Sequence, residues 1–469
     1  MRQTWWLMGF LIVAGTNVAV GDEPKPSARP SEAAATGDKP GPDRAMADRF
    51  AALKAEHHAK QAALWEVLEK AKTQPERVEI FAKTSPDAPY SRRMIELAES
   101  KIGDPTARDA LIWVINKPER MDDGEYGDEF AHAAALLVRH HGDDPLAVSV
   151  GLGLSNVPSI RRDALLLGFY AAAKGHEGKG VARLALATYL EKKAQWAEGA
   201  KQLPDRRKQN KSVVGGDGKL HDPIVDLPDD VYAYVVGLRI CDPALIKAEA
   251  ERLYNEVIAD YGDIPFITLR HRELEALLKE PTPTLGGKPL TEEDRRKIAA
   301  RLARESTLGS VAEAHLDEMH NLIPGKPAPE IDGVDMAGKP LKLSDHRGKV
   351  VVLVFWGSWC GPCMREVPHE RELAERLKDR PFAILGVDCN EEKSAGLKAI
   401  ESEKITWPNW NDGSDGDGPI VKRYHIRSYP SVFVIDAQGI IRHTQFSGED
   451  LDKAVDALLE ELEAKAPKG

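Results

Sequence analysis

Two cysteines separated by two residues carry the clearest chemistry in this sequence. Cys360 and Cys363 enclose Gly361 and Pro362, and the chain of 469 residues has only 4 cysteines. So close a pair cannot join distant segments, and a zinc site would need four ligands, whereas no second cysteine pair or matching histidine pair accompanies it. An inert structural pair is the other alternative, but the motif favours reversible disulfide exchange, in which one thiolate attacks a disulfide and the second thiol resolves the intermediate.

The residues on either side of the motif predict how it is held. A run of β-branched and aromatic residues, Val350–Trp356, precedes it, and a helical pattern at 363–378 follows it. Cys360 is therefore expected at a helix N-terminus, where unpaired N–H groups and the helix dipole favour a thiolate. Pro362 suits the first helical turn, which has no N–H partner to lose. We predict that Cys360 is the attacking nucleophile and that Cys363, one turn further in, resolves the mixed disulfide.

After residue 323 the sequence alternates between strand-like and helix-like patterns. Such alternation predicts a sheet that helices cover on both faces, and a turn at 436–439 predicts a hairpin between the last two strands. We therefore predict an α/β domain at 323–469. Its further strands are expected at 382–388, 431–436 and 440–446, and its further helices at 392–403, 418–424 and 449–465.

Residues 46–322 instead carry apolar side chains at helical spacing, with charged residues between them. Breaks rich in glycine, aspartate and proline occur at 103–105, 142–145 and 262–265, and glycine followed by proline commonly ends a helix. The spacing is compatible with helical-hairpin repeats of about 40 residues, although chance helix ends fit equally well. The predicted fold class is multidomain, with an all-α N-terminal region followed by the α/β domain.

The charge balance excludes one class of partner. Lysines and arginines total 64 against 75 aspartates and glutamates, which gives a formal net charge of -11. Binding of nucleic acid requires clustered positive charge, and the sequence has no basic patch interleaved with aromatic residues. We therefore expect no nucleic-acid partner.

The N-terminus has the pattern of an export signal. Arg2 gives a positive start, residues 5–15 are apolar, and residues 19–21 are small, as signal peptidase requires. We predict a cleaved signal peptide at 1–21 and an extracytoplasmic, periplasmic location, with an uncleaved membrane anchor as the second choice. Residues 22–45 are rich in proline, alanine and charge, which predicts a flexible linker.

Several short motifs resemble one family. Residues 324–330 read PGKPAPE, and Gly338-Lys339, Leu343-Ser344-Asp345 and Gly348-Lys349 follow before the CGPC motif. With that motif, residues 324–465 resemble the extracytoplasmic TlpA/ResA-like redoxins of the thioredoxin superfamily. The resemblance implies a thioredoxin fold, a disulfide-containing protein substrate, and no cofactor besides the cysteine pair. It also implies an electron donor, which in this family is often a membrane protein of the DsbD type.

The resemblance also carries over substrate-binding residues. Pro430 occupies the place of the family's cis-proline, which presents the backbone of the preceding residue, here Tyr429, to an incoming substrate segment. Trp359 would shield the cysteines and define the rim of the site, although simple packing is the alternative. Gly361 and Pro362 complete the expected substrate-binding set.

One departure from thioredoxin concerns proton transfer. Thioredoxin carries a buried aspartate where this chain has Val354. The expected substitute is Glu366, because TlpA/ResA-like members keep a glutamate one turn beyond the second cysteine. A partly buried carboxylate there would exchange protons with Cys363; a solvated surface glutamate is the alternative. No metal site is predicted, because the acidic loop at 412–418 has Arg423 where a calcium loop needs its closing glutamate.

The predicted function is that of an exported thiol–disulfide oxidoreductase, and the Gly-Pro pair between the cysteines favours a reductase over an oxidant. A thiol peroxidase of the redoxin group is one alternative, but peroxiredoxins place threonine where this chain has Gly357. A second alternative is a helical scaffold that binds another protein and carries the redox unit with it.

Overall fold

The structure is a computed structural model that describes residues 42–71, 74–116, 125–154, 159–201, 209–210, 213–214, 220–221, 224–225, 229–280, 283–285, 288–302, 306–413, 418–444 and 447–465. The predicted signal peptide and most of the predicted linker lie outside these residues. Within the described ranges, no helix combines the length and the hydrophobicity needed to span a bilayer. The chain divides into two compact units, one of Met1–Gln209 with Val225–Ala312, the other of Asn210–Ile224 with Glu313–Gly469.

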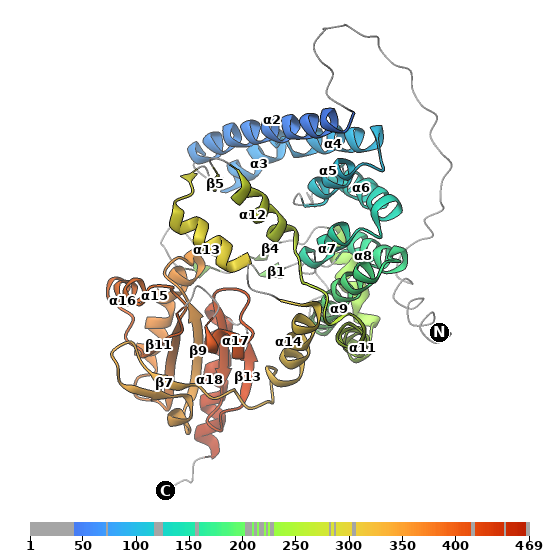
Figure 1. The fold of residues 1–469 in the computed structure, drawn as a ribbon. Helices are drawn as coiled ribbons and strands as arrows, with labels where there is room; N and C mark the ends of the chain where they lie inside the picture. The colour runs from blue at the N-terminus through green and yellow to red at the C-terminus, as the bar shows by residue number, and fades with distance from the viewer. Residues whose placement is uncertain are drawn as a thin grey trace. The chain divides into compact units, whose positions relative to one another are not determined.

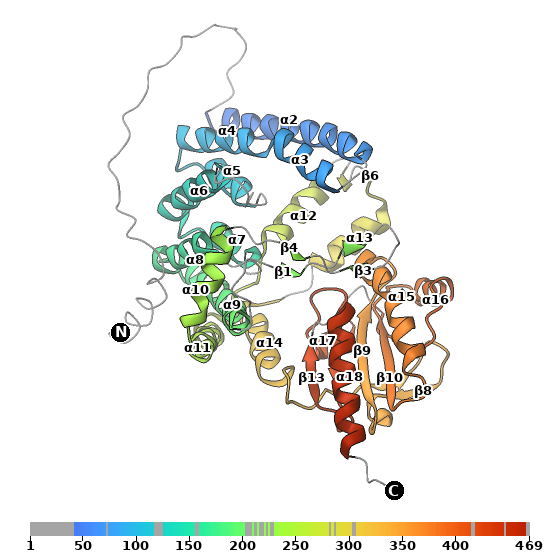
Figure 2. The same ribbon diagram turned by 180° about the vertical axis from the view of Figure 1, so that it is seen from behind.

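The first unit is built from helices, which confirms the predicted all-α region (Figures 1 and 2). At its centre α9 (His176–Ala200) packs against α7, α8 and α11, and most of its side chains are buried. The other helices are α2 (Pro42–Lys70), α3 (Gln74–Thr84), α4 (Asp87–Ser100), α5 (Pro105–Ile115), α6 (Glu125–His141), α7 (Pro145–Gly153), α8 (Ile160–Ala172), α10 (Asp229–Gly237), α11 (Pro243–Tyr261), α12 (Leu269–Lys279), α13 (Glu292–Leu302) and α14 (Leu308–Asn321).

Aspartate-proline pairs in this unit begin helices. Asp104, Asp144 and Asp242 each cap a helix by accepting a hydrogen bond from a backbone N–H of its first turn, and proline follows at the first helical position. The predicted breaks at 103–105 and 142–145 are thus starts of the next helix as much as ends of the previous one. The helical-repeat interpretation stays a prediction.

The C-terminal unit contains a five-stranded sheet with the strand order β11-β10-β9-β12-β13. The strands are β9 (Val350–Trp356), β10 (Phe382–Asp388), β11 (Asn409–Asn411), β12 (Ser431–Ile435) and β13 (Ile441–Thr444). β9 pairs in parallel with β10, which pairs in parallel with β11. β12 is antiparallel to both β9 and β13, so the hairpin predicted between the last two strands is confirmed.

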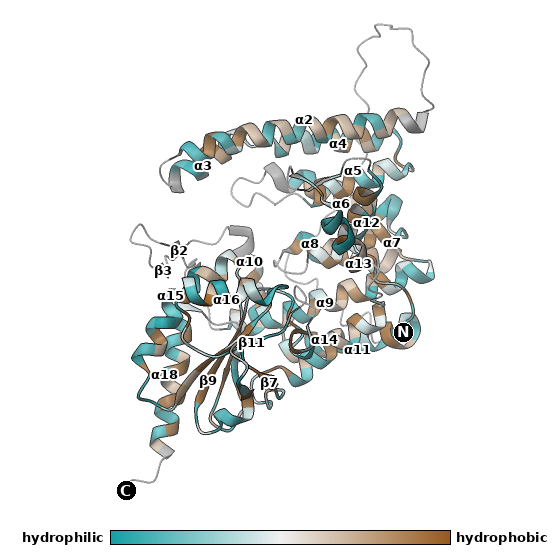
Figure 3. Cartoon of the chain, turned by 60° about the vertical axis from the view of Figure 1, so that its left-hand side comes forward, coloured by the Kyte–Doolittle hydropathy of each residue, from teal (hydrophilic) through white to brown (hydrophobic). Residues whose placement is uncertain are grey.

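Every residue of the central strand β9 is buried, because helices cover both faces of the sheet. Val350, Val352 and Val354 pack into a core with α15 (Gly361–Arg376), α16 (Lys393–Ser402) and α18 (Gly448–Lys465). The alternate residues face a second core that includes α17 (Pro419–Arg423). Figure 3 shows β9 as a hydrophobic strand and α18 as a helix that carries both hydrophilic and hydrophobic residues. The predicted α/β thioredoxin fold is confirmed.

Short elements that the sequence pattern did not predict occur in both units. β7 (Asp332–Val334) and β8 (Pro340–Lys342) form a hairpin, followed by a 3-10 turn at Leu343–His346. Further two-residue strands are β1 (Gln209–Asn210), β2 (Val213–Val214), β3 (Leu220–His221), β4 (Ile224–Val225), β5 (Thr284–Leu285) and β6 (Lys288–Pro289), and the 3-10 helix η1 spans Leu238–Ile240.

Helix α14 begins in the first unit, and its part from Glu313 onward belongs to the second unit. His425 lies 2.7 Å from the Asp317 carboxylate, and Arg427 lies 2.6 Å from that of Glu318. The hydrogen bond from His425 lowers the pKa of Asp317. These contacts fasten the end of α14 to the loop that precedes β12.

Candidate active site

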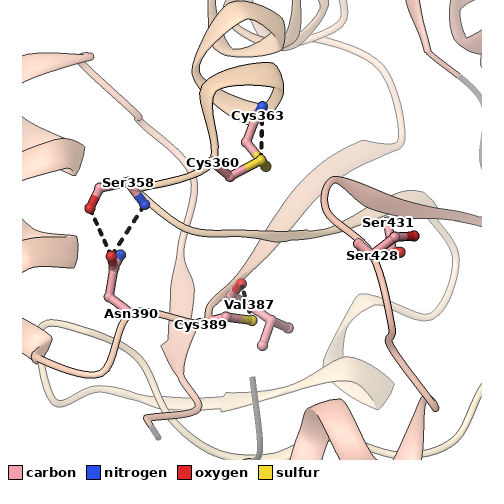
Figure 4. Close-up of a disulfide and its surroundings, with 8 residues drawn as sticks. All are labelled: Ser358, Cys360, Cys363, Val387, Cys389, Asn390, Ser428 and Ser431. Carbon is pink, nitrogen blue, oxygen red and sulfur yellow. Dashed lines mark hydrogen bonds between the residues drawn. A yellow bond between two sulfur atoms is a disulfide. The ribbon is translucent and has the colours of Figure 1, made fainter. Parts of the chain in front are cut away.

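The two motif cysteines form a disulfide at the N-terminus of α15. Their Cα atoms lie 5.2 Å apart, and 5% of Cys360 and 2% of Cys363 are exposed. Cys360 is the N-cap residue, and its Sγ accepts a hydrogen bond of 3.1 Å from the backbone N–H of Cys363 (Figure 4). The predicted position at a helix N-terminus is confirmed. When the disulfide opens, this N–H and the helix dipole will stabilise a thiolate on Cys360.

Trp359 and Tyr429 form an aromatic rim beside the disulfide. Trp359 is 52% exposed, and its ring meets that of Tyr429 edge to face at 5.1 Å between centroids. Gly357 allows this position, since a Cβ atom there would lie 2.7 Å from the Trp359 indole. The Tyr429–Pro430 peptide bond is cis, which confirms that expectation. Gly361 and Pro362 are exposed at the start of α15.

A buried polar network holds the turn between β9 and Cys360, and sequence analysis missed it. The backbone N–H and the hydroxyl of Ser358 both donate to Asn390 Oδ1, at 3.2 and 2.7 Å (Figure 4). Asn390 in turn donates from its backbone and its side chain to Asp388 at the end of β10. Because parallel strands end at the same edge of a sheet, polar residues after the 382–388 strand could have indicated this contact.

Burial makes the ionised form of the Asp388 carboxyl less favourable, and hydrogen bonds from neighbouring residues oppose this effect. Burial raises the pKa of its carboxyl, while hydrogen bonds from Asn390 and Asn411 oppose that rise. The carboxyl lies against Gly396, where a Cβ atom would be 2.1 Å from Asp388 Oδ2. The hydrogen bonds from Ser358 to Asn390 and from Asn390 to Asp388 therefore hold the turn before Cys360 in place. Gly396 is needed because only a residue without a Cβ atom allows the Asp388 carboxyl to lie so close.

The other two cysteines do not belong to the redox pair. Cys389 is fully buried, and its thiol donates a 3.5 Å hydrogen bond to the Val387 carbonyl. Burial raises the pKa of Cys389 to about 12, although a contact with Tyr429 opposes that rise. A thiol that stays protonated is a poor nucleophile. Cys241 is partly exposed and lies at the end of η1 in the helical unit.

A narrow pocket lies beside Cys363, between the first turns of α15 and the sheet. Glu370 reaches it from α15, and its side chain is almost fully buried, with 5% of the residue exposed. Burial, and secondly the negative charge of Glu366, raises the pKa of Glu370 to about 8. The pocket is lined by Val354, Trp356, Cys363, Val367, Glu370, Ile405, Trp407 and Pro430.

Glu366 and Glu370 occupy different environments on one helix. Glu366 lies one turn beyond Cys363, as expected, and is partly exposed, but it does not line the pocket. Sequence analysis missed Glu370, although a signal was present. Cys363, Val367 and Glu370 follow one another at spacings of four and three residues, so Glu370 falls within the apolar stripe of the helix.

In the described part of the acidic loop at 412–418, Asp412 bonds to the backbone of the helix that follows. The Asp412 carboxylate accepts hydrogen bonds from the backbone N–H groups of Ile420 and Val421, at 2.9 and 2.8 Å. It therefore caps the start of α17. Residues 414–417 of the loop lie outside the described residues.

Comparison with known proteins places this geometry in a family. A model of the AhpC/TSA family matches residues 324–444. Over 138 residues the chain is 31% identical to the thiol-disulfide oxidoreductase ResA of Bacillus thuringiensis subsp. konkukian (strain 97-27), covering 29% of this chain and 78% of that protein. The chain belongs to the TlpA/ResA-like branch of the thioredoxin superfamily.

Other thiol-disulfide oxidoreductases match the same segment. The ResA protein of Geobacillus kaustophilus (strain HTA426) is 33% identical over 137 residues, which cover 29% of this chain and 77% of that protein. A crystal structure of the thioredoxin domain of a thiol-disulfide oxidoreductase from Bacteroides vulgatus is 31% identical, covers 30% of this chain and 99% of its own, and has a TM-score of 0.28. The predicted enzyme class, a thiol–disulfide oxidoreductase, is confirmed.

Proposed function

We propose that this TlpA/ResA-like protein is an exported reductase that exchanges disulfides with protein substrates through Cys360 and Cys363. The observation that carries the proposal is the position of Cys360, whose sulfur caps α15 and accepts the N–H of Cys363. A thiolate at that place is stabilised before it attacks. The buried Cys363 is held within bonding distance to resolve the intermediate.

The proposed cycle begins with the reduced pair. The Cys360 thiolate attacks one sulfur of a substrate disulfide, a bond forms between them, and the other substrate sulfur leaves with the electron pair and takes up a proton. Cys363 then loses its proton and attacks the Cys360 sulfur. The bond between Cys360 and the substrate breaks, so the substrate leaves as a second thiol. The substrate disulfide has gained two electrons and the enzyme pair has lost them.

The rim beside the disulfide is the proposed substrate-binding surface. Trp359 projects into solvent next to Tyr429 and the adjoining Pro430, while Gly361 and Pro362 lie exposed beside Cys360. Half-exposed aromatic rings can bury apolar parts of an unfolded or extended substrate at little entropic cost. We expect a polypeptide segment around a disulfide to lie across this rim. No cofactor besides the cysteine pair is expected.

The remaining parts of the proposal concern location and domains. We propose a signal peptide at 1–21, a linker at 22–45, a helical domain at 46–322 and a thioredoxin-like domain at 323–469, with an uncleaved anchor as the second choice. In an oxidising compartment a reductase needs an electron donor, for which a membrane protein of the DsbD type is the expected class. We further propose that the helical domain binds another protein; it exposes large apolar side chains such as Ile240, which is 82% exposed.

Reduction of insulin disulfides by the full chain, with dithiothreitol as donor, tests the proposed reaction. The parent protein should turn over, and the Cys360→Ser variant should lose turnover completely. The Cys363→Ser variant should react once and stop as a mixed disulfide. If a folded parent that titrates with dithiothreitol reduces no insulin, the general reductase is excluded, and a dedicated substrate or an oxidising role replaces it.

A further inference from the structure

The pocket beside Cys363 contains one ionisable side chain besides the cysteine itself. From β9 it receives Val354 and Trp356, and the loops supply Ile405, Trp407 and Pro430, none of which ionises. Glu370 alone brings a carboxyl group into it, from the same helix face as Cys363. A buried carboxyl without a structural partner costs stability, so its presence in an apolar pocket needs a reason.

We propose that Glu370 exchanges the proton of Cys363, accepting it when Cys363 attacks the mixed disulfide and returning it when the disulfide is reduced. The inference rests on the proposed roles of Cys360 and Cys363. It goes beyond them because Glu370, rather than Glu366 one turn earlier, is the carboxyl that shares the pocket with the resolving sulfur.

Val354 explains why a carboxyl is required from the helix. At this position of β9 thioredoxin carries its buried aspartate, whereas the Val354 side chain of this chain supplies only an apolar wall to the pocket. Glu370 lines the same pocket from α15. The acid therefore reaches the resolving cysteine from α15 instead of from the strand.

The residues around Glu370 in the pocket are mostly apolar, and hydrogen bonds hold two of them, Trp356 and Trp407, to Asn409. The Trp356 indole donates a 2.8 Å hydrogen bond to Asn409, whose side chain also donates to the Trp407 carbonyl. The Trp407 indole N–H has no hydrogen-bond partner among the described residues, and only 5% of Glu370 is exposed beside it. A carboxyl group that lines the same apolar pocket as the Cys363 sulfur is placed to exchange a proton with it.

Burial, and secondly the negative charge of Glu366, favours the protonated form of Glu370 while the disulfide is closed. Glu366 lies one turn earlier on α15, and its negative charge adds to the effect of burial, which raises the pKa of Glu370 to about 8. On the outer side of α15, His369 is paired with Asp452 of α18 at 3.5 Å. At neutral pH the oxidised enzyme therefore stores a proton on Glu370.

In the proposed cycle the proton on Glu370 moves to Cys363 in one half-reaction and returns in the other. During reduction a donor thiolate attacks Cys360, the disulfide breaks, and the electron pair goes to the Cys363 sulfur. Glu370 gives its proton to that sulfur and becomes a carboxylate. During resolution the same proton returns to Glu370 as the Cys363 sulfur attacks Cys360 and the substrate thiol leaves. No further oxidant or reductant is involved.

Stopped-flow reduction of the disulfide by dithiothreitol, followed by tryptophan fluorescence between pH 6 and 10, tests the inference on the full chain. Glu370→Gln should reduce the rate at pH 7 by about 100-fold, the scale of general acid catalysis. The deficit should shrink toward parity above pH 9, where the parent's Glu370 has lost its proton. Glu372→Gln, an exposed glutamate on the same helix, is the matched control and should behave as the parent.

Two further measurements separate the possible failures. The ¹³C chemical shift of the Glu370 carboxyl in the oxidised protein should titrate near pH 8, and Glu370→Asp should recover part of the lost rate. If Glu370→Gln reacted at the same rate as the Glu372→Gln control at every pH, the role of Glu370 would be overturned while the proposed function would stand. Formation of the dithiothreitol adduct on Cys363 instead of Cys360, found by trapping the intermediate, would instead overturn the proposed function.

Discussion

Replacing Glu370 should change how the stability of the C-terminal unit depends on pH. In the folded, oxidised protein its pKa is about 8, against an ordinary value of 4.5. The unfolded chain therefore releases this proton at a lower pH than the folded chain does. Since the folded state binds the proton more tightly, protonation of Glu370 contributes fully to the free energy of unfolding below pH 4.5. This contribution is lost as the pH rises to about 8.

The size of this effect follows from the same two values. At about 1.4 kcal/mol for each tenfold change in proton affinity, the difference between pKa values of 4.5 and about 8 corresponds to about 5 kcal/mol at most. In Glu370→Gln the amide has the shape of the protonated acid and does not ionise. The variant should therefore gain up to about 5 kcal/mol relative to the parent between pH 4 and pH 9.

Urea-induced unfolding of the full chain, sampled by brief deuterium labelling of the β9 amides, measures this unit without interference from the helical unit. With a urea dependence of about 2 kcal/mol per molar, the midpoint of Glu370→Gln relative to the parent should rise by up to about 2.5 M between pH 4 and pH 9. The Glu372→Gln control should show no such trend. A constant difference between parent and Glu370→Gln at all pH values would refute the assignment of a buried, protonated acid.

Two further substitutions test other parts of the site. Gly386→Ala should destabilise the C-terminal unit by about 3 kcal/mol or more, because a Cβ atom there would lie 1.7 Å from Asn409 Oδ1 and disrupt its bond to Trp356; an unchanged urea midpoint would contradict the packing. Cys389→Ala should leave disulfide exchange unchanged within about twofold, because its buried thiol stays protonated; loss of insulin reduction in the folded variant would show that it takes part.

The strands and helices around the motif could be predicted because their patterns are local. β9 and β10 are continuous apolar runs flanked by helical segments, and both lie where they were expected. The helix N-terminus at Cys360 followed from the strand before it and the proline after it. β11 could not be predicted in the same way, since its three residues, Asn409–Asn411, form a strand only through pairing with β10.

The polar parts of the site depend on contacts that are distant in sequence. Asn390 meets Ser358 because parallel strands β9 and β10 end side by side, so its role emerges only from the sheet. Glu370 lies in a charged stretch of α15 that resembles a solvated helix surface. Only its register with Cys363 and Val367 shows that it faces the core, and the raised pKa depends on residues from β9 and two loops.

Trapping of the mixed disulfide tests the central claim most directly. The reduced Cys363→Ser variant of the full chain, mixed with a disulfide-containing peptide, should form one covalent adduct that peptide mapping places on Cys360, and a thiol should release it. The Cys360→Ser variant should form no adduct at a comparable rate, because its remaining Cys363 is 2% exposed and lies within the first turn of α15. An adduct formed faster through Cys363 than through Cys360 would contradict the assigned roles and the mechanism built on them.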